Sequence, residues 1–329
     1  RDMLPIGEAR AKSFKTDWSE LRIDKPLALG VQVYEELPVT AIIPYIDWSP
    51  FFWAWDLKSL YPGILEHEKW GAQARALFKD AQAMLKDIVA NKRFRPRAVV
   101  GYWPAASKGD DVEVYTDDSR QQVLTTLHFL RQQKRKQDSD EYECLADFIA
   151  PASSGRADYI GAFAVTTGPE ADAYADSFKD RGDDYSSIMA KALADRFAEA
   201  MAELMHKKAR EQWGYGRDEN LSIEQLIKEE YRGIRPAPGY PACPDHTEKL
   251  LLWQLLDVEK NIGITLTESM AMMPPSSVSG LYFSHPEAHY FRVSRIGRDQ
   301  VEDYALRKGM TVAEVERWLA PNLGYDERV

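Results

Sequence analysis

Cysteine is rare in this chain. Its 329 residues include only Cys144 and Cys243, which lie far apart in the sequence. Two cysteines at this separation form neither a disulfide framework nor the closely spaced ligand pairs of a zinc site, and their scarcity suits a reducing compartment. We therefore expect two buried free thiols in a cytoplasmic protein.

The motifs of the commonest enzyme classes are also missing. The chain has no G-x-G-x-x-G after a strand, no G-x-x-x-x-G-K-[ST], no H-E-x-x-H and no G-x-S-x-G. The glycine-rich turn of dinucleotide-binding folds and of ordinary methyltransferase folds is therefore absent. Only His285 and His289 among the six histidines are close together, and on a predicted hairpin their spacing does not bring them onto one metal ion. The sequence thus indicates no catalytic residue and no metal site.

Long apolar runs and an excess of positive charge are likewise lacking. No segment approaches the length that spans a bilayer, and no signal peptide opens the chain. The formal net charge of −10 argues against a nucleic-acid binder, whose affinity comes from Lys and Arg side chains on phosphates. Because the chain begins with Arg1 and a polar segment rather than with Met, we expect a fragment of a larger multidomain protein.

What the chain does contain is a mixed order of strands and helices. With 44% hydrophobic residues it can bury a large core. The β-prone residues predict strands over 29–46, 97–103, 111–115, 124–130, 159–166, 279–284 and 290–294. Lys108-Gly109-Asp110 predicts the turn between the second and third strands. His285-Pro286-Glu287 predicts a hairpin turn between the last two.

Two long helices are predicted from apolar residues that recur every three or four positions. They cover residues 68–91 and 184–213. The second helix carries one wide apolar stripe, which packing against a core explains without any cofactor. The stripe consists of Tyr185, Ile188, Met189, Ala192, Leu193, Phe197, Ala200, Met201 and Leu204.

The remaining predicted elements are short. Capping and end signals predict helices from Ser222 to about Tyr231, from Thr247, up to Gly309 and after Thr311. Residues 1–27 have few periodic apolar positions and predict an extended N-terminal arm. Because no βαβ alternation recurs, we expect an α+β fold with a mainly antiparallel sheet.

The loop from Arg232 to His246 is the most informative segment. Prolines at 236, 238, 241 and 244 restrict its backbone, while Gly239 permits a positive φ. A stiff loop of this kind exposes backbone groups that no sheet uses, and these can recognise the edge of a flat heterocycle. Arg235 adds a planar fork that suits a ligand carboxylate. A rigid connector in which Arg235 pairs with a nearby acid explains the same residues equally well, so the residues alone leave both interpretations open.

Two other segments could contribute to a ligand site. Asp47 ends an apolar stretch and precedes an aromatic cluster, so its carboxylate could pair with a ligand ammonium or sulfonium beside aromatic faces. The simpler interpretation is that the aromatic rings fill the core and Asp47 caps the next element. Tyr290 and Phe291 are neighbours on a predicted strand and point to opposite faces, so one could pack in the core while the other faces a cleft.

Together these segments resemble the C-terminal activation domain of bacterial cobalamin-dependent methionine synthase. The similarity covers nearly the whole chain and is carried by LPVTAIIPYIDWSPFFWAWDL, RAVVGYWPA, SGRADYIGAFAVTTG, REQWGYG, YRGIRPAPGYPACPDHTEK and SVSGLYFSHPEAHYF. The R-x-x-x-G-Y pattern from Arg235 to Tyr240 matches the family's S-adenosylmethionine signature. The resemblance implies one curved, C-shaped α+β domain over residues 1–329, with a twisted antiparallel sheet flanked by helices.

The resemblance also implies a binding site for S-adenosylmethionine in a shallow groove. The residues that it assigns to this ligand are Asp47, Arg235, Ala237, Gly239, Tyr240, Tyr290 and Phe291. Arg235 would hold the methionyl carboxylate and Asp47 the α-amino group. Backbone groups of Ala237 and its neighbours would meet the adenine, and Tyr290 and Phe291 would border the ligand.

The implied function is reactivation of a methyltransferase that makes methionine. That enzyme passes a methyl group from methyltetrahydrofolate through cobalamin to homocysteine, and oxidation occasionally leaves inactive cob(II)alamin. An electron from flavodoxin and the methyl group of S-adenosylmethionine, held by this module, would restore methylcobalamin. The implied partners are therefore flavodoxin and the cobalamin-binding domain of the same polypeptide, and we expect a monomer. The alternative is an interaction module whose main work is docking these two partners.

Overall fold

The computed structural model describes residues 2–326 and contains one main antiparallel sheet. Its strands are β1 Gly30–Tyr34, β2 Arg97–Lys108, β3 Asp111–Tyr115, β4 Val123–His128, β5 Asp158–Thr166 and β8 Ser277–Tyr282. The long strand β2 is central, because β5 pairs with one of its edges while β1 and β3 share the other. β4 extends the sheet beyond β3, and β8 extends it beyond β5. A separate small ribbon pairs β6 Thr265–Leu266 with β7 Met272–Met273.

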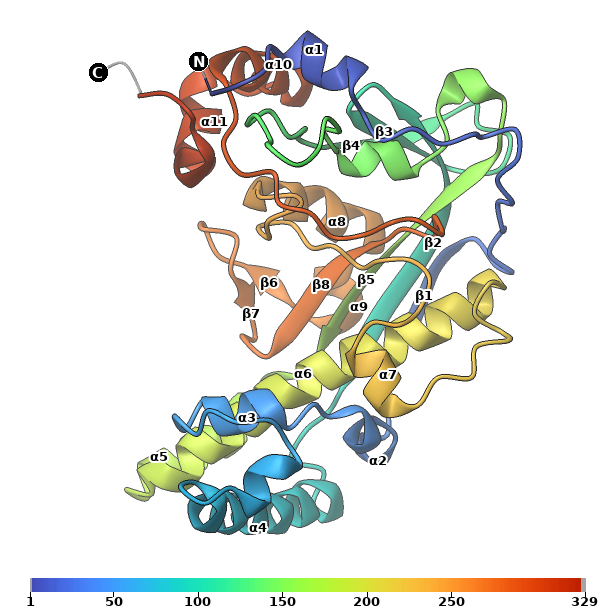
Figure 1. The fold of residues 1–329 in the computed structure, drawn as a ribbon. Coiled ribbons are helices and arrows are strands. Elements are labelled where there is room, and N and C mark those ends of the chain that lie inside the picture. Colours follow the sequence, from blue (N-terminus) through green and yellow to red (C-terminus); the bar gives the residue numbers. More distant parts are fainter. Residues whose placement is uncertain (1, 327–329) are drawn as a thin grey trace.

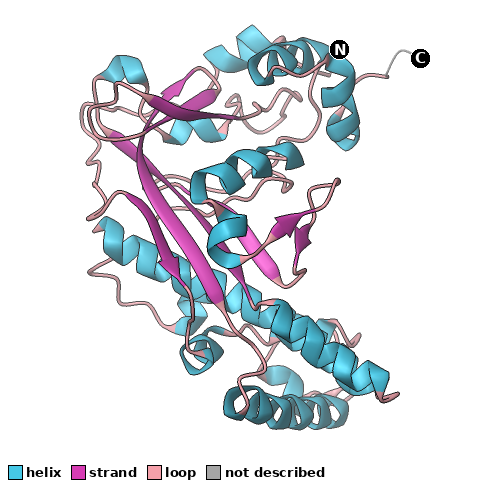
Figure 2. Ribbon diagram, turned by 180° about the vertical axis from the view of Figure 1, so that it is seen from behind, coloured by secondary structure: helices cyan, strands magenta, loops and turns pink. Residues whose placement is uncertain are grey.

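Helices lie on both faces and at both ends of this sheet. They are α1 Ile6–Ala11, α2 Val39–Ile42, α3 Ser49–Trp53, α4 Gly71–Ala90, α5 Pro169–Asp180, α6 Asp184–Trp213, α7 Ile223–Ile227, α8 Lys249–Leu256, α9 Val258–Ile262, α10 Arg298–Lys308 and α11 Val312–Trp318. In Figure 1, α1, α10 and α11 lie at one end of the sheet and α3 and α4 at the other, which gives the molecule a curved outline. Figure 2 shows the twisted central strands running between these two groups of helices. The α+β prediction with a twisted, mainly antiparallel sheet is confirmed.

The central strands bury both of their faces. In β5, Phe163 and Val165 belong to a core formed with α4, α5 and α6, while Ala162 and Ala164 belong to a second core formed with α8 and α9. Successive side chains of a strand point to opposite faces, so covering both faces requires an apolar residue at nearly every position. This explains the uninterrupted apolar run of the predicted strand over residues 159–166.

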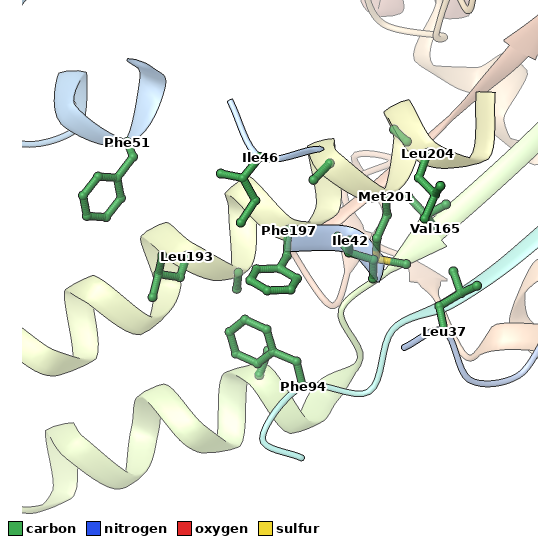
Figure 3. Packing of buried hydrophobic residues seen from close by; sticks show 14 of the residues in the cluster. Leu37, Ile42, Ile46, Phe51, Phe94, Val165, Leu193, Phe197, Met201 and Leu204 are labelled. Carbon is green, nitrogen blue, oxygen red and sulfur yellow. The ribbon is translucent and has the colours of Figure 1, made fainter. Parts of the chain in front are cut away.

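The longest helix, α6, has the bounds that the periodicity predicted. Asp183 caps its first turn by accepting a hydrogen bond from the Ser186 N–H at 3.1 Å. Its buried side packs into the first core, where the rings of Phe197 and Phe94 meet edge to face at 5.2 Å. Figure 3 shows these two rings facing one another, with Leu193 and Met201 on the same side of the helix. The predicted helix over residues 68–91 is confirmed as α4.

The prediction of a strand over residues 29–46 is wrong for its second half. Only β1 is a strand, and α2 and a 3-10 helix, Ile43–Tyr45, follow it. Ile42 and Ile46 are four positions apart and both buried, so a helical turn buries the two side chains on one side. Pro38 and Pro44 also lack the N–H groups that a sheet requires.

The predicted hairpin around His285-Pro286-Glu287 does not form. Residues 290–294 belong to no strand, although the Val293 N–H donates to the Pro241 carbonyl at 2.9 Å. β8 pairs with β5 along one edge, and the proline-rich loop pairs along the other edge, where Ile234 forms an antiparallel bridge with Phe283. Each stretch of a strand edge pairs with one neighbour, and the loop already occupies the stretch at Leu281 and Phe283, so residues 290–294 cannot pair there.

Smaller differences concern the ends of the chain and of its helices. The predicted extended arm, residues 1–27, contains the helix α1 and is held at its far end by the Leu27 N–H, which donates to the Gln212 carbonyl at 2.9 Å. Tyr185 and Ile188 of the predicted apolar stripe are exposed, whereas Met189 and Ala190 next to them are buried, so the first two lie outside the buried side of α6. The capping box at Ser222 is confirmed, but its helix, α7, ends at Ile227 rather than near Tyr231.

Candidate functional site

A pocket of about 350 Å³ opens where the proline-rich loop, β8 and α6 meet. The loop contributes the largest share of its wall, α6 contributes Glu199 and β5 contributes Phe163. The lining residues are Phe163, Glu199, Glu229, Arg235, Pro236, Ala237, Tyr240, Pro241, Ala242, Val278, Ser279, Tyr290 and Phe291. Five of the seven residues that the sequence predicted for a ligand therefore meet at one pocket.

The proline-rich loop is attached to the sheet along β8. The Leu281 N–H donates to the Pro236 carbonyl at 2.8 Å, next to the bridge between Ile234 and Phe283. Gly280 allows this approach, since a Cβ atom there would lie 2.8 Å from the Pro236 oxygen. The backbone that carries Arg235 is thus fixed as an extension of the sheet.

Beyond this attachment the loop closes a tight turn. The Ala237 carbonyl accepts hydrogen bonds from the Tyr240 N–H at 3.2 Å and from the Cys243 thiol at 2.9 Å, and the Gly239 N–H donates to the Cys243 carbonyl at 2.8 Å. Gly239 has a φ of +92°, as its predicted role requires. The turn leaves Tyr240 exposed at its tip. Both cysteines are buried, as predicted.

Arg235 lines the pocket and is also paired with an acid, as the connector interpretation described, while its contact with a ligand carboxylate stays a prediction. Its Nη2 donates to Glu203 at 2.9 Å, and its Nη1 donates to the Tyr231 hydroxyl at 2.6 Å and to His206 Nδ1 at 3.1 Å. A guanidinium carries five N–H donors. Within residues 2–326 the Nε–H and one Nη2–H remain without an acceptor, which is the number that a bidentate carboxylate needs.

Burial and charge tune the groups around Arg235. Burial alone would lower the pKa of Arg235, but the neighbouring Tyr231 and Glu203 oxygens outweigh it and raise the pKa, so the guanidinium stays charged. Burial raises the pKa of Glu203, while Arg235 opposes that shift. Burial lowers the pKa of His206 well below its usual value, with Arg210 and Arg235 adding to the effect, so this imidazole is neutral.

Tyr290 and Phe291 both border the pocket, although neither lies on a strand. The Tyr290 hydroxyl accepts a hydrogen bond from the Arg235 N–H at 2.9 Å, and burial raises its pKa to about 12. Phe291 packs against the second core and against the core formed by α10 and α11. The prediction that one ring packs in a core while its neighbour faces a cleft is confirmed in part. Phe291 packs against the cores, but both rings border the pocket.

Two acids in the lining were not among the predicted site residues. Glu199 and Glu229 both border the pocket, and within residues 2–326 neither forms an ion pair with a Lys, Arg or His. Glu199 lies four positions before Glu203 on α6, so the two share a helix face, and Glu229 has a φ of +58°. Helix periodicity could have indicated the first of these, whereas no local pattern indicates the second.

Asp47 lies outside the pocket lining. It follows the 3-10 helix Ile43–Tyr45, and its Oδ1 accepts a hydrogen bond from the Ser49 N–H at 3.2 Å at the start of α3. The N-cap of α3 is Trp48 and, in the described part of the chain, receives no side-chain cap. The simpler interpretation, in which Asp47 caps the next element, is therefore wrong in detail, and the carboxylate only closes the turn before the helix. A contact between Asp47 and a ligand ammonium stays a prediction.

A second pocket, of about 390 Å³, adjoins the first across Ala237 and Tyr240. Gly239 belongs to this pocket rather than to the first, together with His246 and Lys249. The site is therefore an open groove with two hollows. Among residues 2–326 no group of His, Cys, Asp and Glu could hold a metal ion. None of the helices in this range combines the length and apolarity that crossing a bilayer needs.

The fold and the pocket define an α+β domain whose groove offers a guanidinium and two carboxylates that form no ion pair within the described part of the chain. A family model described as the activation domain of vitamin B12 dependent methionine synthase matches residues 38–309. A solved structure described as the MetH reactivation domain bound to AdoHcy (S-adenosylhomocysteine) is 55% identical, with a TM-score of 0.97 over 99% of this chain and 100% of that chain. The chain therefore belongs to the family of methionine synthase activation domains, which confirms the resemblance.

Proposed function

We propose that this chain binds S-adenosylmethionine in the groove around Arg235 and acts as the reactivation module of a cobalamin-dependent methionine synthase. The observation that carries the proposal is Arg235 itself, which borders the pocket and has two N–H groups without an acceptor in the described range 2–326. The solved structure with 55% identity is described as bound to AdoHcy, a ligand with the same amino-acid end and adenosine.

The charges of the pocket suit a ligand that carries both signs. A carboxylate would form charge-assisted hydrogen bonds with Arg235. The α-ammonium and the sulfonium are cations, and Glu199 and Glu229 offer carboxylates that pair with no Lys, Arg or His among residues 2–326. The Tyr290 ring could add a cation–π contact. The resemblance alone supports Asp47 as the partner of the ammonium, so all three acids are candidates for that role.

The proline-rich loop suits recognition of the adenine. Because the Ala237 carbonyl already accepts two hydrogen bonds, the Ala237 N–H is the group left to meet the edge of the heterocycle. Gly239 and Tyr240 belong to the turn that presents this group. Pre-ordering of the turn reduces the entropy lost when a ligand binds.

The chemical task of the chain would be to hold the methyl donor in place. S-adenosylmethionine would supply a methyl group for the reductive methylation of cob(II)alamin, which another domain of the same polypeptide would hold. The electron would come from flavodoxin. Correct placement of the reacting groups by itself greatly increases the reaction rate. The chain would thus form one non-self-sufficient part of a cytoplasmic methyltransferase in methionine biosynthesis, working as a monomer.

The alternative, a module that chiefly docks flavodoxin and the cobalamin domain, has one observation in its favour. Tyr240 is 64% exposed and Tyr290 43% exposed at the pocket, and exposed aromatic rings are common where partners dock. Both roles are compatible. They differ in what Arg235 does, since ligand binding depends on its guanidinium whereas docking does not.

Calorimetric titration of the chain with S-adenosylmethionine tests the proposal. We expect saturable binding that Arg235→Ala abolishes. Arg97→Ala is the matched control, because Arg97 pairs with Glu170 away from the pocket and should leave binding unchanged. A folded wild-type chain that binds no nucleotide would contradict the proposal, and flavodoxin binding that survives Arg235→Ala would then favour the docking module.

A further inference from the structure

Three side chains outside the pocket lining accept hydrogen bonds from the Arg235 guanidinium. Glu203 and His206 come from α6, and Tyr231 comes from the segment after α7. None of the three belongs to the lining of either hollow of the groove. Their contacts occupy Nη1 and one N–H of Nη2, so they fix the orientation of the guanidinium plane.

His206 accepts a hydrogen bond from Arg235 in one defined tautomer of its ring. The guanidinium can only donate, so Nδ1 of His206 must accept, and the ring proton must reside on Nε2. Full burial next to Arg210 and Arg235 keeps the ring neutral, as the lowered pKa indicates. A protonated ring would place a second donor against Arg235 and break this contact.

These acceptors are themselves immobilised by aromatic packing. The His206 ring stacks on Tyr282 with a centroid distance of 4.9 Å and an angle of 8°, and it meets the Tyr231 ring edge to face at 4.8 Å. The guanidinium of Arg210 lies 3.9 Å from the centroid of the Tyr231 ring. Rigid neighbours of this kind hold a charged side chain in one rotamer.

The arrangement also contains buried polar atoms without a partner. Glu203 Oε1 and His206 Nε2 are both buried and unpaired within residues 2–326. An unpaired buried polar atom disfavours folding, and apolar residues on this face of α6 would avoid the cost. Buried polar atoms without a partner are more common at functional sites, because binding there requires a geometry that folding does not.

We infer that Glu203, His206 and Tyr231 are positioning residues that orient Arg235 for the carboxylate of the ligand. A free arginine side chain samples many rotamers, and binding would have to remove that freedom. With three acceptors in place that freedom is already lost, and within residues 2–326 the Nε–H and one Nη2–H remain without an acceptor. The inference rests on the proposed function, since it concerns how the same pocket recognises the amino-acid end of S-adenosylmethionine.

The test compares two ligands that differ only in this end. S-adenosylhomocysteine carries the amino and carboxylate groups, whereas 5′-methylthioadenosine lacks both and keeps the adenosine. Tyr231→Phe removes one acceptor and keeps the ring under Arg210, and Glu203→Ala removes the charged acceptor. We expect affinity for S-adenosylhomocysteine to fall about fivefold in the first variant and at least about tenfold in the second. Affinity for 5′-methylthioadenosine should change by less than about twofold.

Matched controls remove similar contacts elsewhere. Tyr174→Phe deletes a hydroxyl that donates to Asp87 at 2.6 Å, and Glu170→Ala deletes a carboxylate that pairs with Arg97 at 2.6 Å. Both should bind the two ligands as the wild type does. The inference is overturned if the wild type binds S-adenosylhomocysteine and both site variants bind it equally well. It is also overturned if they lose the two ligands in parallel, which indicates a general structural role.

Two further outcomes are distinguishable from these. A wild-type chain that binds neither ligand contradicts the proposed function rather than the role of the three residues. If Glu203→Ala does not fold, Tyr231→Phe decides the question alone, because a single hydroxyl is removed and the buried ring is kept. Selective loss of S-adenosylhomocysteine in that variant supports the inference, and unchanged binding overturns it.

Discussion

A Cβ atom at position 239 would lie 2.2 Å from Cε1 of His246, so Gly239 is in direct contact with this imidazole. The φ of +92° at the same residue also disfavours any other side chain. Two independent constraints therefore require glycine in the turn of the R-x-x-x-G-Y pattern.

Gly239→Ala should both destabilise the chain and weaken nucleotide binding. We expect a loss of about 2–4 kcal/mol in unfolding free energy from strain and overpacking together. Affinity for S-adenosylmethionine should fall because the loop moves away from His246. Gly263→Ala is the control, since Gly263 has a φ of +75° with open space around it. Urea unfolding and calorimetry measure the two effects, and equal losses in both variants would refute a specific clash.

Neutralising the acids of the pocket should affect a cationic ligand more than a neutral one. S-adenosylmethionine carries a sulfonium, whereas S-adenosylhomocysteine has an uncharged thioether. We expect Glu199→Gln and Glu229→Gln to lower affinity for the former about three- to tenfold and for the latter less. Glu224→Gln, on the exposed side of α7, should change neither. Calorimetry with both ligands checks this, and a preference that is unchanged in both variants would remove the acids from the site.

Stability should fall in acid because of His285. Burial lowers the pKa of this ring from 6.5 to about 4, with Arg232 and His289 adding to the effect. The unfolded chain therefore binds the proton first, so the stability that the neutral ring provides is complete above about pH 6.5 and is lost as the pH falls toward 4. We expect about 2 kcal/mol after allowance for solvent screening.

His285→Asn should remove this part of the pH dependence. An asparagine oxygen can still accept the hydrogen bond that the Glu287 N–H donates to His285 Nδ1 at 3.0 Å. Urea unfolding at pH 7.5 and pH 5 gives the slope for each protein. A variant with the slope of the wild type would show that other groups cause the acid sensitivity.

Removing Arg131 should destabilise the fold without changing the ligand site. Arg131 is 3% exposed and donates to Asp110 and to Asp147 at 2.8 Å. Arg131→Met removes the cation that these two buried carboxylates share, and among residues 2–326 only Asp110 keeps a second cationic partner, Arg10 at 2.9 Å. We expect a loss of about 3–5 kcal/mol. Lys228→Met, which breaks an exposed pair with Glu224, should cost less than about 0.5 kcal/mol. Thermal unfolding separates the two, and similar melting temperatures would contradict the buried role.

The predictions from sequence succeed where the signal is local. α4, α6 and the pair β2 and β3 have apolar periodicity, caps or turn residues within their own segments. They fail where another segment decides the outcome. The stretch around Ile42 contains β-prone residues but folds as a helix against α6, and residues 290–294 lose their predicted partner because the proline-rich loop already occupies the edge of β8.

The residues of the candidate site also fall into those that a local pattern predicts and those that it does not. Arg235, Ala237 and Tyr240 were predictable because the prolines and Gly239 mark a stiff loop, and the resemblance to the family identifies its pattern. Glu203 and His206 were not predictable as neighbours of Arg235, since 32 and 29 positions separate them from it in the chain.

The sequence by itself determined that this chain forms an α+β domain with a long amphipathic helix and a rigid loop that presents an arginine. Those properties follow from backbone restriction and from the periodic burial of side chains, both of which act over a few residues. Only the tertiary structure decided which acceptors hold Arg235 and which of its N–H groups remain free. Hydrogen bonds between distant segments depend on how the whole chain packs, and no local pattern encodes that choice.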